Sequence, residues 1–213
     1  MKIITQNHIA EFLALLTSLI FFGSLKKGKL KSLPFFLLFI LLVELTGSYL
    51  RRVAHTGNTW LYNLSIPVEY SYYLYLFWLH GRKGVKRFVS GGIVLFWVVV
   101  IFCFFSQRIN VLHDYVLVTG EILVIITSCS YIYELFQSNE ETSLFRNYFY
   151  WLVAGLLLFN LGDVIYFVLY PVIHEKKWDR FDLIFKLINN SLLLLLYLSY
   201  IISILVLRQN QRE

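Results

Sequence analysis

The sequence predicts an all-α membrane protein with seven transmembrane helices, in which two similar halves are joined by a connecting helix. Three observations predict this fold: the composition, the spacing of the apolar runs and a pair of internal repeats. Of the 213 residues, 58% are hydrophobic and 15% are charged, whereas an ordinary soluble domain carries roughly 25% charged residues. The chain is therefore too apolar for a soluble domain, and its solvent is the lipid bilayer.

The apolar runs define the expected helices. Backbone groups in hydrocarbon must be paired internally, and these runs show no strand-like alternation of polar and apolar residues, so helices are favoured over a barrel. We expect membrane spans at 7–25, 33–54, 60–80, 88–106, 111–136, 147–171 and 181–207. The loops between them are too short to form a separate domain. Residues 1–213 should therefore form a single transmembrane domain.

Two polar signatures recur along the chain. Residues 11–18 and 121–128, in the first and fifth spans, share four identities in eight and two Leu/Ile exchanges. Residues 61–65 of the third span, LYNLS, resemble residues 187–191 of the seventh, LINNS. Because these similarities occur in the same order, we expect a three-plus-one-plus-three plan, with repeat A at 7–80, a connector helix at 88–106 and repeat B at 111–207. The almost purely apolar connector is expected to face lipid.

The basic residues predict the topology. Lysines are concentrated at 26–31, and a second basic cluster lies at 82–87, so the positive-inside rule places both loops in the cytoplasm. The N-terminus is then outside and the C-terminus inside, which makes the internal repeat parallel. Topology accounts for most of the net charge of +6, and we expect no nucleic-acid partner. The expected location is the cytoplasmic (inner) membrane of a bacterium, with the lipid bilayer as the main partner.

This architecture resembles the transporter–opsin–receptor grouping, which includes small sugar carriers and microbial rhodopsins. No span contains a Pro-Gln pair, and Lys186 lies near the start of the seventh span, not at its middle where a retinal lysine belongs. The resemblance therefore implies neither sugar transport nor light sensing. The sequence of residues 58–70, which contains NTWLYN and then PVEY, is also similar to that of small multi-pass proteins of Bacteroidota-type bacteria. This resemblance implies no particular activity.

Polar residues within the spans predict where a site lies. An ionisable residue in a membrane span costs about 2.5 to 3.5 kcal/mol on insertion scales, so it usually faces the bundle interior. Glu44, Ser48 and Arg51 follow one another at i, i+4 and i+7 and share one helix face. The candidate ligand- or ion-binding residues are Glu44, Ser48, Arg51, Tyr62, Asn63, Glu69, Glu121, Asn160, Asp163, Lys186, Asn189 and Asn190. We expect an outward-opening polar cavity with Glu44 and Glu69 near the middle of the membrane.

Structural roles compete with this interpretation. Serine and threonine at helix contacts often form hydrogen bonds between helices, which is the expectation for Thr17, Ser18, Thr127, Ser128 and Ser199. The structural alternative for Glu11, Glu121 and Asp163 is interfacial solvation or an ion pair with Arg51 or Lys186. Asp163 and Lys186 are the first such pair to test. Both a binding role and a structural role therefore remain possible for the acidic residues.

Three functions remain open. The first is binding or transport of a small solute, a lipid or a proton, with Glu44 and Glu69 as titrating groups. The second is a signalling or anti-phage accessory of the CRISPR-associated type that oligomerises into a pore. The third is an intramembrane lipid hydrolase, which is disfavoured because the five histidines lie at span ends with none paired at i+3 or i+4. We expect no catalytic residues, metal or cofactor, whereas homo-oligomerisation stays open.

Overall fold

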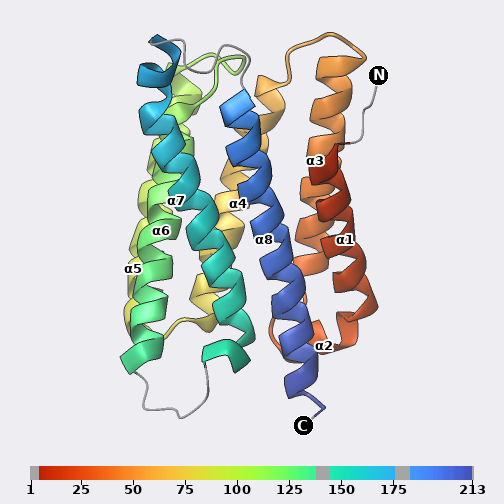
Figure 1. Cartoon of the computed structure of the whole chain (residues 1–213). Helices are drawn as coiled ribbons and strands as arrows, with labels where there is room; N and C mark the ends of the chain where they lie inside the picture. The colour runs from red at the N-terminus through yellow and green to blue at the C-terminus, as the bar shows by residue number, and fades with distance from the viewer. Residues whose placement is uncertain (1–4, 138–143, 176–182, 213) are drawn as a thin grey trace.

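A computed structural model describes residues 5–137, 144–175 and 183–212 of the chain. This part contains eight α-helices and a short 3-10 helix, η1, and no strand, which confirms the all-α class (Figure 1). The elements are α1 (Gln6–Ile20), α2 (Phe22–Lys27), α3 (Leu33–Arg52), α4 (Thr59–His80), α5 (Lys83–Ser106), α6 (Asp114–Gln137), η1 (Leu144–Arg146), α7 (Tyr148–Glu175) and α8 (Leu183–Asn210).

Each predicted span overlaps a described helix, and their bounds differ by up to five residues. The first predicted span, 7–25, is divided at Phe21, where the backbone leaves the helical conformation between α1 and α2. The fourth begins at Lys83, five residues before the predicted 88, because a side chain of α6 supports its first turn. Residues 181–182 of the last predicted span lie outside the described part of the chain.

Five of the described helices are long and apolar enough to cross a membrane, namely α3, α5, α6, α7 and α8. The α1 helix has only 15 residues, and α4 carries many polar side chains on its 22 residues. Both nevertheless pack alongside the five long helices. The structure is therefore that of a multi-pass membrane protein.

Side chains from neighbouring elements complete several helix ends. The Glu134 carboxylate of α6 accepts hydrogen bonds from the backbone N–H groups of Arg82 and Val85, both at 3.0 Å. A helix leaves its first N–H groups without partners inside the helix, and a carboxylate at that end also interacts favourably with the helix dipole. Glu134 therefore fixes the start of α5 against the end of α6.

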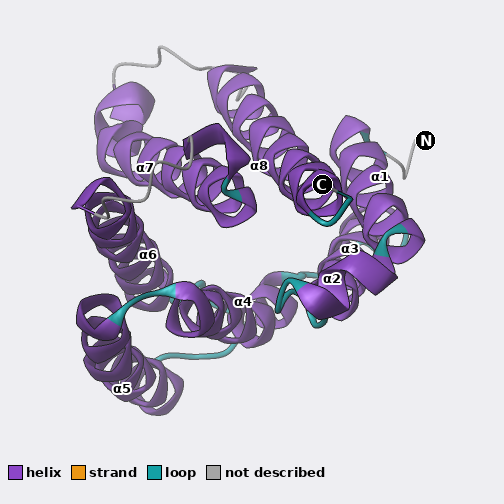
Figure 2. Ribbon diagram, turned by 90° about the horizontal axis from the view of Figure 1, so that it is seen from below, coloured by secondary structure: helices purple, strands orange, loops and turns teal. Residues whose placement is uncertain are grey.

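Six helices form a closed ring, and α5 lies outside it. Contacts join α1 to α3, α3 to α4, α4 to α6, α6 to α7, α7 to α8, and α8 back to α1. Figure 2 shows this ring from one end, with α5 packed on the outer side of α4 and α6. Only 28% of the apolar stretch of α5 is buried, the lowest share among the five span-like helices. This is the position expected of a lipid-facing connector.

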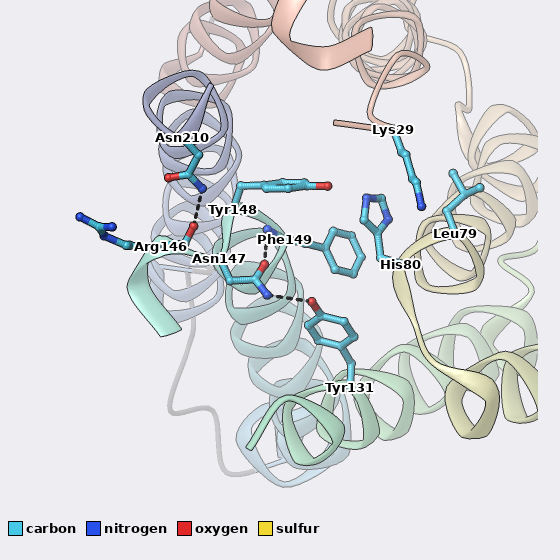
Figure 3. Close-up of a pocket in the computed structure, with 9 residues that line it drawn as sticks. All are labelled: Lys29, Leu79, His80, Tyr131, Arg146, Asn147, Tyr148, Phe149 and Asn210. Atoms are coloured by element: carbon cyan, nitrogen blue, oxygen red, sulfur yellow. Dashed lines mark hydrogen bonds between the residues drawn. The ribbon is translucent and has the colours of Figure 1, made fainter. Parts of the chain in front are cut away.

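Aromatic side chains fill the middle of the ring. Phe77 of α4 packs edge-to-face on Phe149 of α7, with ring centroids 5.8 Å apart, and Tyr131 of α6 packs on the same Phe149 at 5.0 Å. Tyr73 and Tyr200 are also buried. Such aromatic pairs contribute about 0.5–1.5 kcal/mol beyond the area they bury. Tyr131 and Phe149 also line a cavity at the α2 end of the bundle (Figure 3), and another cavity lies toward the opposite end.

Four of the five hydroxyl groups predicted to join helices instead bond within their own helices, and the fifth, that of Ser128, is buried without a hydrogen-bond partner. In four cases the hydroxyl donates to a backbone carbonyl three or four residues earlier, at 2.6–2.8 Å, as found for Thr17, Ser18, Thr127 and Ser199. This back-bonding satisfies a hydroxyl in a setting without water. Small residues still allow close helix packing, since a Cβ on Gly155 of α7 would overlap Ser199 of α8.

Candidate functional site

A cavity of about 730 Å³ lies at the end of the bundle opposite α2. Its walls come from α1, α3, α4, α7 and α8, together with the loop that precedes α4. Eight of the twelve predicted site residues line it, namely Glu44, Ser48, Arg51, Tyr62, Glu69, Lys186, Asn189 and Asn190. The three residues predicted to share a face of α3 therefore point into the same space.

Three carboxylates from three helices meet in this cavity. Glu11 of α1 is only 3% exposed, and it interacts electrostatically with Glu44 of α3 and Glu69 of α4. The Tyr62 hydroxyl donates to Glu44 Oε2 at 3.2 Å, and the Tyr73 hydroxyl donates to Glu69 Oε1 at 2.6 Å. Like charges held this close repel one another, so protons or a cation between them would lower the energy of the cavity.

His8 is a cavity residue that sequence reasoning missed. It is 6% exposed, and its ring occupies the third position of α1, where Nδ1 accepts a hydrogen bond from the Thr5 backbone N–H at 3.2 Å. The other ring nitrogen, Nε2, lies 3.3 Å from the Ser48 hydroxyl and is the N–H donor of that pair. The spacing of Thr5, His8 and Glu11 at i, i+3 and i+6 was the available signal, because it places them on one helix face.

Basic residues occupy the mouth of the cavity, above the carboxylates. Arg51 and Lys186 are exposed and Arg52 is half-buried, all three lining the opening. Beside them the Asn7 amide donates to Asn190 Oδ1 at 2.8 Å, which joins α1 to α8. The cavity thus has basic side chains at its rim and carboxyl groups at its floor.

Asn63, also predicted as a site residue, instead holds the loop between α5 and α6. Its amide group donates to the carbonyl oxygens of Ile109 and Val111, both at 2.7 Å, and its Oδ1 accepts from the His113 backbone N–H at 3.0 Å. All three hydrogen-bonding positions that point at this loop are used. Asn63 therefore fastens the loop between α5 and α6 to α4.

Glu121 and Asp163 form a second acidic group, between α6 and α7. Glu121 is fully buried and interacts with the Asp163 side chain. Tyr70 of α4 lies within electrostatic range of both and of Glu69, which itself interacts with Asp163. The fourth predicted residue outside the cavity, Asn160, donates to the Leu156 carbonyl of its own helix at 2.7 Å. The second acidic group thus borders the cavity but does not line it.

Among the described residues, no group of three or more His, Cys, Asp or Glu side chains is arranged to hold a metal ion. Comparison of the chain with family models, with curated proteins and with solved structures finds no match. The interpretation of the cavity therefore rests on its own residues.

Proposed function

We propose that this integral membrane protein binds a small solute that carries a positively charged amine in the 730 Å³ cavity, as a carrier or receptor of the transporter type. The observation that supports this most is the meeting of Glu11, Glu44 and Glu69 in one cavity. Its volume is within the roughly 300–1,000 Å³ typical of small-molecule sites. Carboxylates bind ammonium groups through short charge-assisted hydrogen bonds. Tyr62 and Tyr197 add aromatic faces, which attract cations.

The proposal includes a placement in the membrane. Seven helices would cross it, with the N-terminus outside, the C-terminus inside and the cavity open to the exterior of a bacterial cell. Support comes from the two lysine- and arginine-rich loops, which lie at the same end of the bundle, away from the cavity. The parallel repeat is supported by the order of the ring, because α1, α3 and α4 lie opposite α6, α7 and α8, respectively.

Charge removal at the floor tests the proposal. We expect Glu44→Gln and Glu69→Gln each to weaken amine binding tenfold or more, because a hydrogen bond to a charged group contributes roughly 1.5–3 kcal/mol and tenfold corresponds to about 1.4 kcal/mol. The measurement is a thermal-shift titration of the detergent-purified protein with putrescine and ethanolamine. Native mass spectrometry of the same sample identifies any amine that co-purifies.

Asp114→Asn is the matched control for this experiment. Asp114 is an exposed carboxylate at the same end of the bundle and does not line the cavity, so its loss should leave binding unchanged. Equal weakening of amine binding in all three variants would show that the effect comes from the overall charge of the protein and not from the cavity. Full amine binding by the folded Glu44→Gln and Glu69→Gln proteins would rule out the site.

Protons are a second ligand that the same residues support. The Tyr73 hydroxyl bonded to Glu69 also receives a hydrogen bond from the Tyr200 hydroxyl at 3.4 Å, so a line of hydroxyl groups continues from the cavity into the aromatic core. An amine competes with protons for carboxylates, so its affinity should rise as the pH rises. Glu69→Gln is expected to flatten this pH profile while the protein stays folded. An unchanged profile in that variant would exclude Glu69 as the coupled group.

A further inference from the structure

The amine cavity contains hydrogen-bond donors as well as carboxyl groups, and they follow one face of α3. Glu44, Ser48 and Arg51 all line the cavity. Because an α-helix rises about 1.5 Å per residue, Ser48 lies roughly 6 Å and Arg51 roughly 10 Å from Glu44 along the helix axis, in the direction of the mouth. A carboxyl group, a hydroxyl group and a guanidinium group therefore follow one another from the floor to the mouth.

The Ser48 hydroxyl group is available to donate a hydrogen bond to a ligand. His8 Nδ1 accepts from the Thr5 backbone N–H, so Nε2 carries the ring proton and donates to Ser48 Oγ across 3.3 Å. A hydroxyl group donates one hydrogen bond and accepts two, and this contact uses only an acceptor position. Within the described part of the chain, Ser48 makes no other side-chain hydrogen bond. Its proton is therefore free to meet an acceptor such as a carboxylate.

Basic side chains from two helices surround the mouth of the cavity. Arg51 and Arg52 of α3 and Lys186 of α8 line it. Arg51 is near enough to Tyr62, which donates to Glu44, to act on it electrostatically. Among the described lining residues, the only carboxyl groups are those of the floor. A second ammonium group at the mouth would be repelled, whereas a carboxylate would be attracted and would fit the fork of donors that an arginine offers.

Apolar side chains also contribute to the wall of this cavity, among them Val43, Ile66 and Leu193. They give methylene groups a surface to pack on, and burying one methylene group strengthens binding roughly fourfold. The cavity thus offers acceptors for an ammonium group, donors for an anionic group and an apolar surface for the chain that joins them.

We propose that the solute of the amine cavity is an ω-amino acid, whose ammonium group binds at Glu44 and whose carboxylate binds at Ser48 and Arg51. This inference rests on the proposed amine site and names the class of solute that the site takes. An α-amino acid is too short, because both of its charged groups are attached to one carbon atom, whereas Glu44 and Arg51 are about two helical turns apart. A chain of several methylene groups is needed to reach from one to the other.

Three ligands with the same number of methylene groups test this inference. All carry one ammonium group, and the other end is a carboxylate in 5-aminovalerate, a methyl group in pentylamine and a second ammonium group in putrescine. Calorimetric titration of the detergent-purified full-length chain should give 5-aminovalerate an affinity about tenfold above that of pentylamine, because a charge-assisted hydrogen bond is gained. Putrescine should bind most weakly of the three.

Substitution of Arg51 separates the two ends of the solute. Arg51→Gln should abolish the preference for 5-aminovalerate and leave the affinity for pentylamine unchanged. Arg51→Lys, which keeps the charge but not the fork of donors, should retain part of the preference. The control is Arg108→Gln, because Arg108 is an exposed arginine in the loop between α5 and α6, at the same end of the bundle, and does not line the cavity. It should leave all three affinities unchanged.

The outcomes separate this inference from the amine site on which it rests. Equal affinities of the unaltered protein for 5-aminovalerate and pentylamine would overturn the inference and leave the amine site standing. Tighter binding of putrescine than of 5-aminovalerate, or a preference that survives Arg51→Gln, would do the same. If none of the three ligands bound, the amine site itself would be overturned, and the ω-amino acid with it.

Discussion

Replacing Gly120 with valine is expected to lower the free energy of unfolding by roughly 3 kcal/mol or more, because overpacking a filled interior forces side chains and backbone apart. Gly120 lies on α6 directly under the ring of Tyr70 from α4, and a Cβ at this position would overlap ring atoms. Tyr70 is 4% exposed and also packs on Tyr73 and Phe96, with ring centroids 6.0 and 6.1 Å apart. It therefore has no room to move. Thermal unfolding of the detergent-purified protein measures the effect.

Gly91→Val is the matched control for this substitution. Gly91 lies on the exposed face of α5, and a Cβ there would meet no atom within 4 Å, so the change should stay within about 0.5 kcal/mol. Similar unfolding temperatures for the two variants would contradict the tight contact between α4 and α6. Because Tyr70 borders Glu69, Glu121 and Asp163, Gly120→Val should also weaken amine binding, whereas Gly91→Val should not.

Asn63→Asp is expected to destabilise the protein by roughly 2–4 kcal/mol. The substitution replaces an amide that donates to the Ile109 and Val111 carbonyls with a carboxylate oxygen that faces two acceptors. Leaving buried hydrogen-bonding groups without partners costs about 1–3 kcal/mol, and more when a charge is involved. The unfolding temperature should fall. Hydrogen–deuterium exchange should also show that the backbone amides of the loop between α5 and α6 exchange faster than in the unaltered protein.

Asn110→Asp makes the same chemical change within that loop, at an exposed side chain. It should leave both thermal stability and exchange close to those of the unaltered protein. If Asn63→Asp were as well tolerated as Asn110→Asp, the loop would be held by something other than Asn63. Asn63 would then again be a candidate ligand-binding residue.

The sequence was sufficient to locate the helices but not to define their ends. Unbroken apolar runs predict helices because hydrocarbon tolerates only paired backbone groups, and five of the described helices are long and apolar enough to cross a membrane. The break at Phe21 was missed because the residues around it remain apolar, so hydropathy does not change there. The early start of α5 depends on Glu134, a residue about fifty positions away. Support of this kind comes from tertiary packing and leaves no local pattern.

The candidate site was predictable to the extent that one helix face determines it. Glu44, Ser48 and Arg51 could be grouped because their spacing fixes a common direction. Which helices become neighbours cannot be read from periodicity, so the separate placement of Glu121 and Asp163 was not foreseen. His8 was missed because it lies at a predicted span end with no second histidine at i+3 or i+4, whereas its ring turns inward to Ser48.

The ring is closed by two helices that are far apart in the sequence, because α1 packs on α8. The Asn7 amide of α1 donates to Asn190 of α8, and the Gln211 amide, just after α8, donates to the Ser24 carbonyl of α2. Until α8 is inserted, Glu11 and Glu44 lie in a groove with an open side, which lipid or the insertion machinery must cover. A nascent chain that stops before α8 has most of its membrane helices but no cavity.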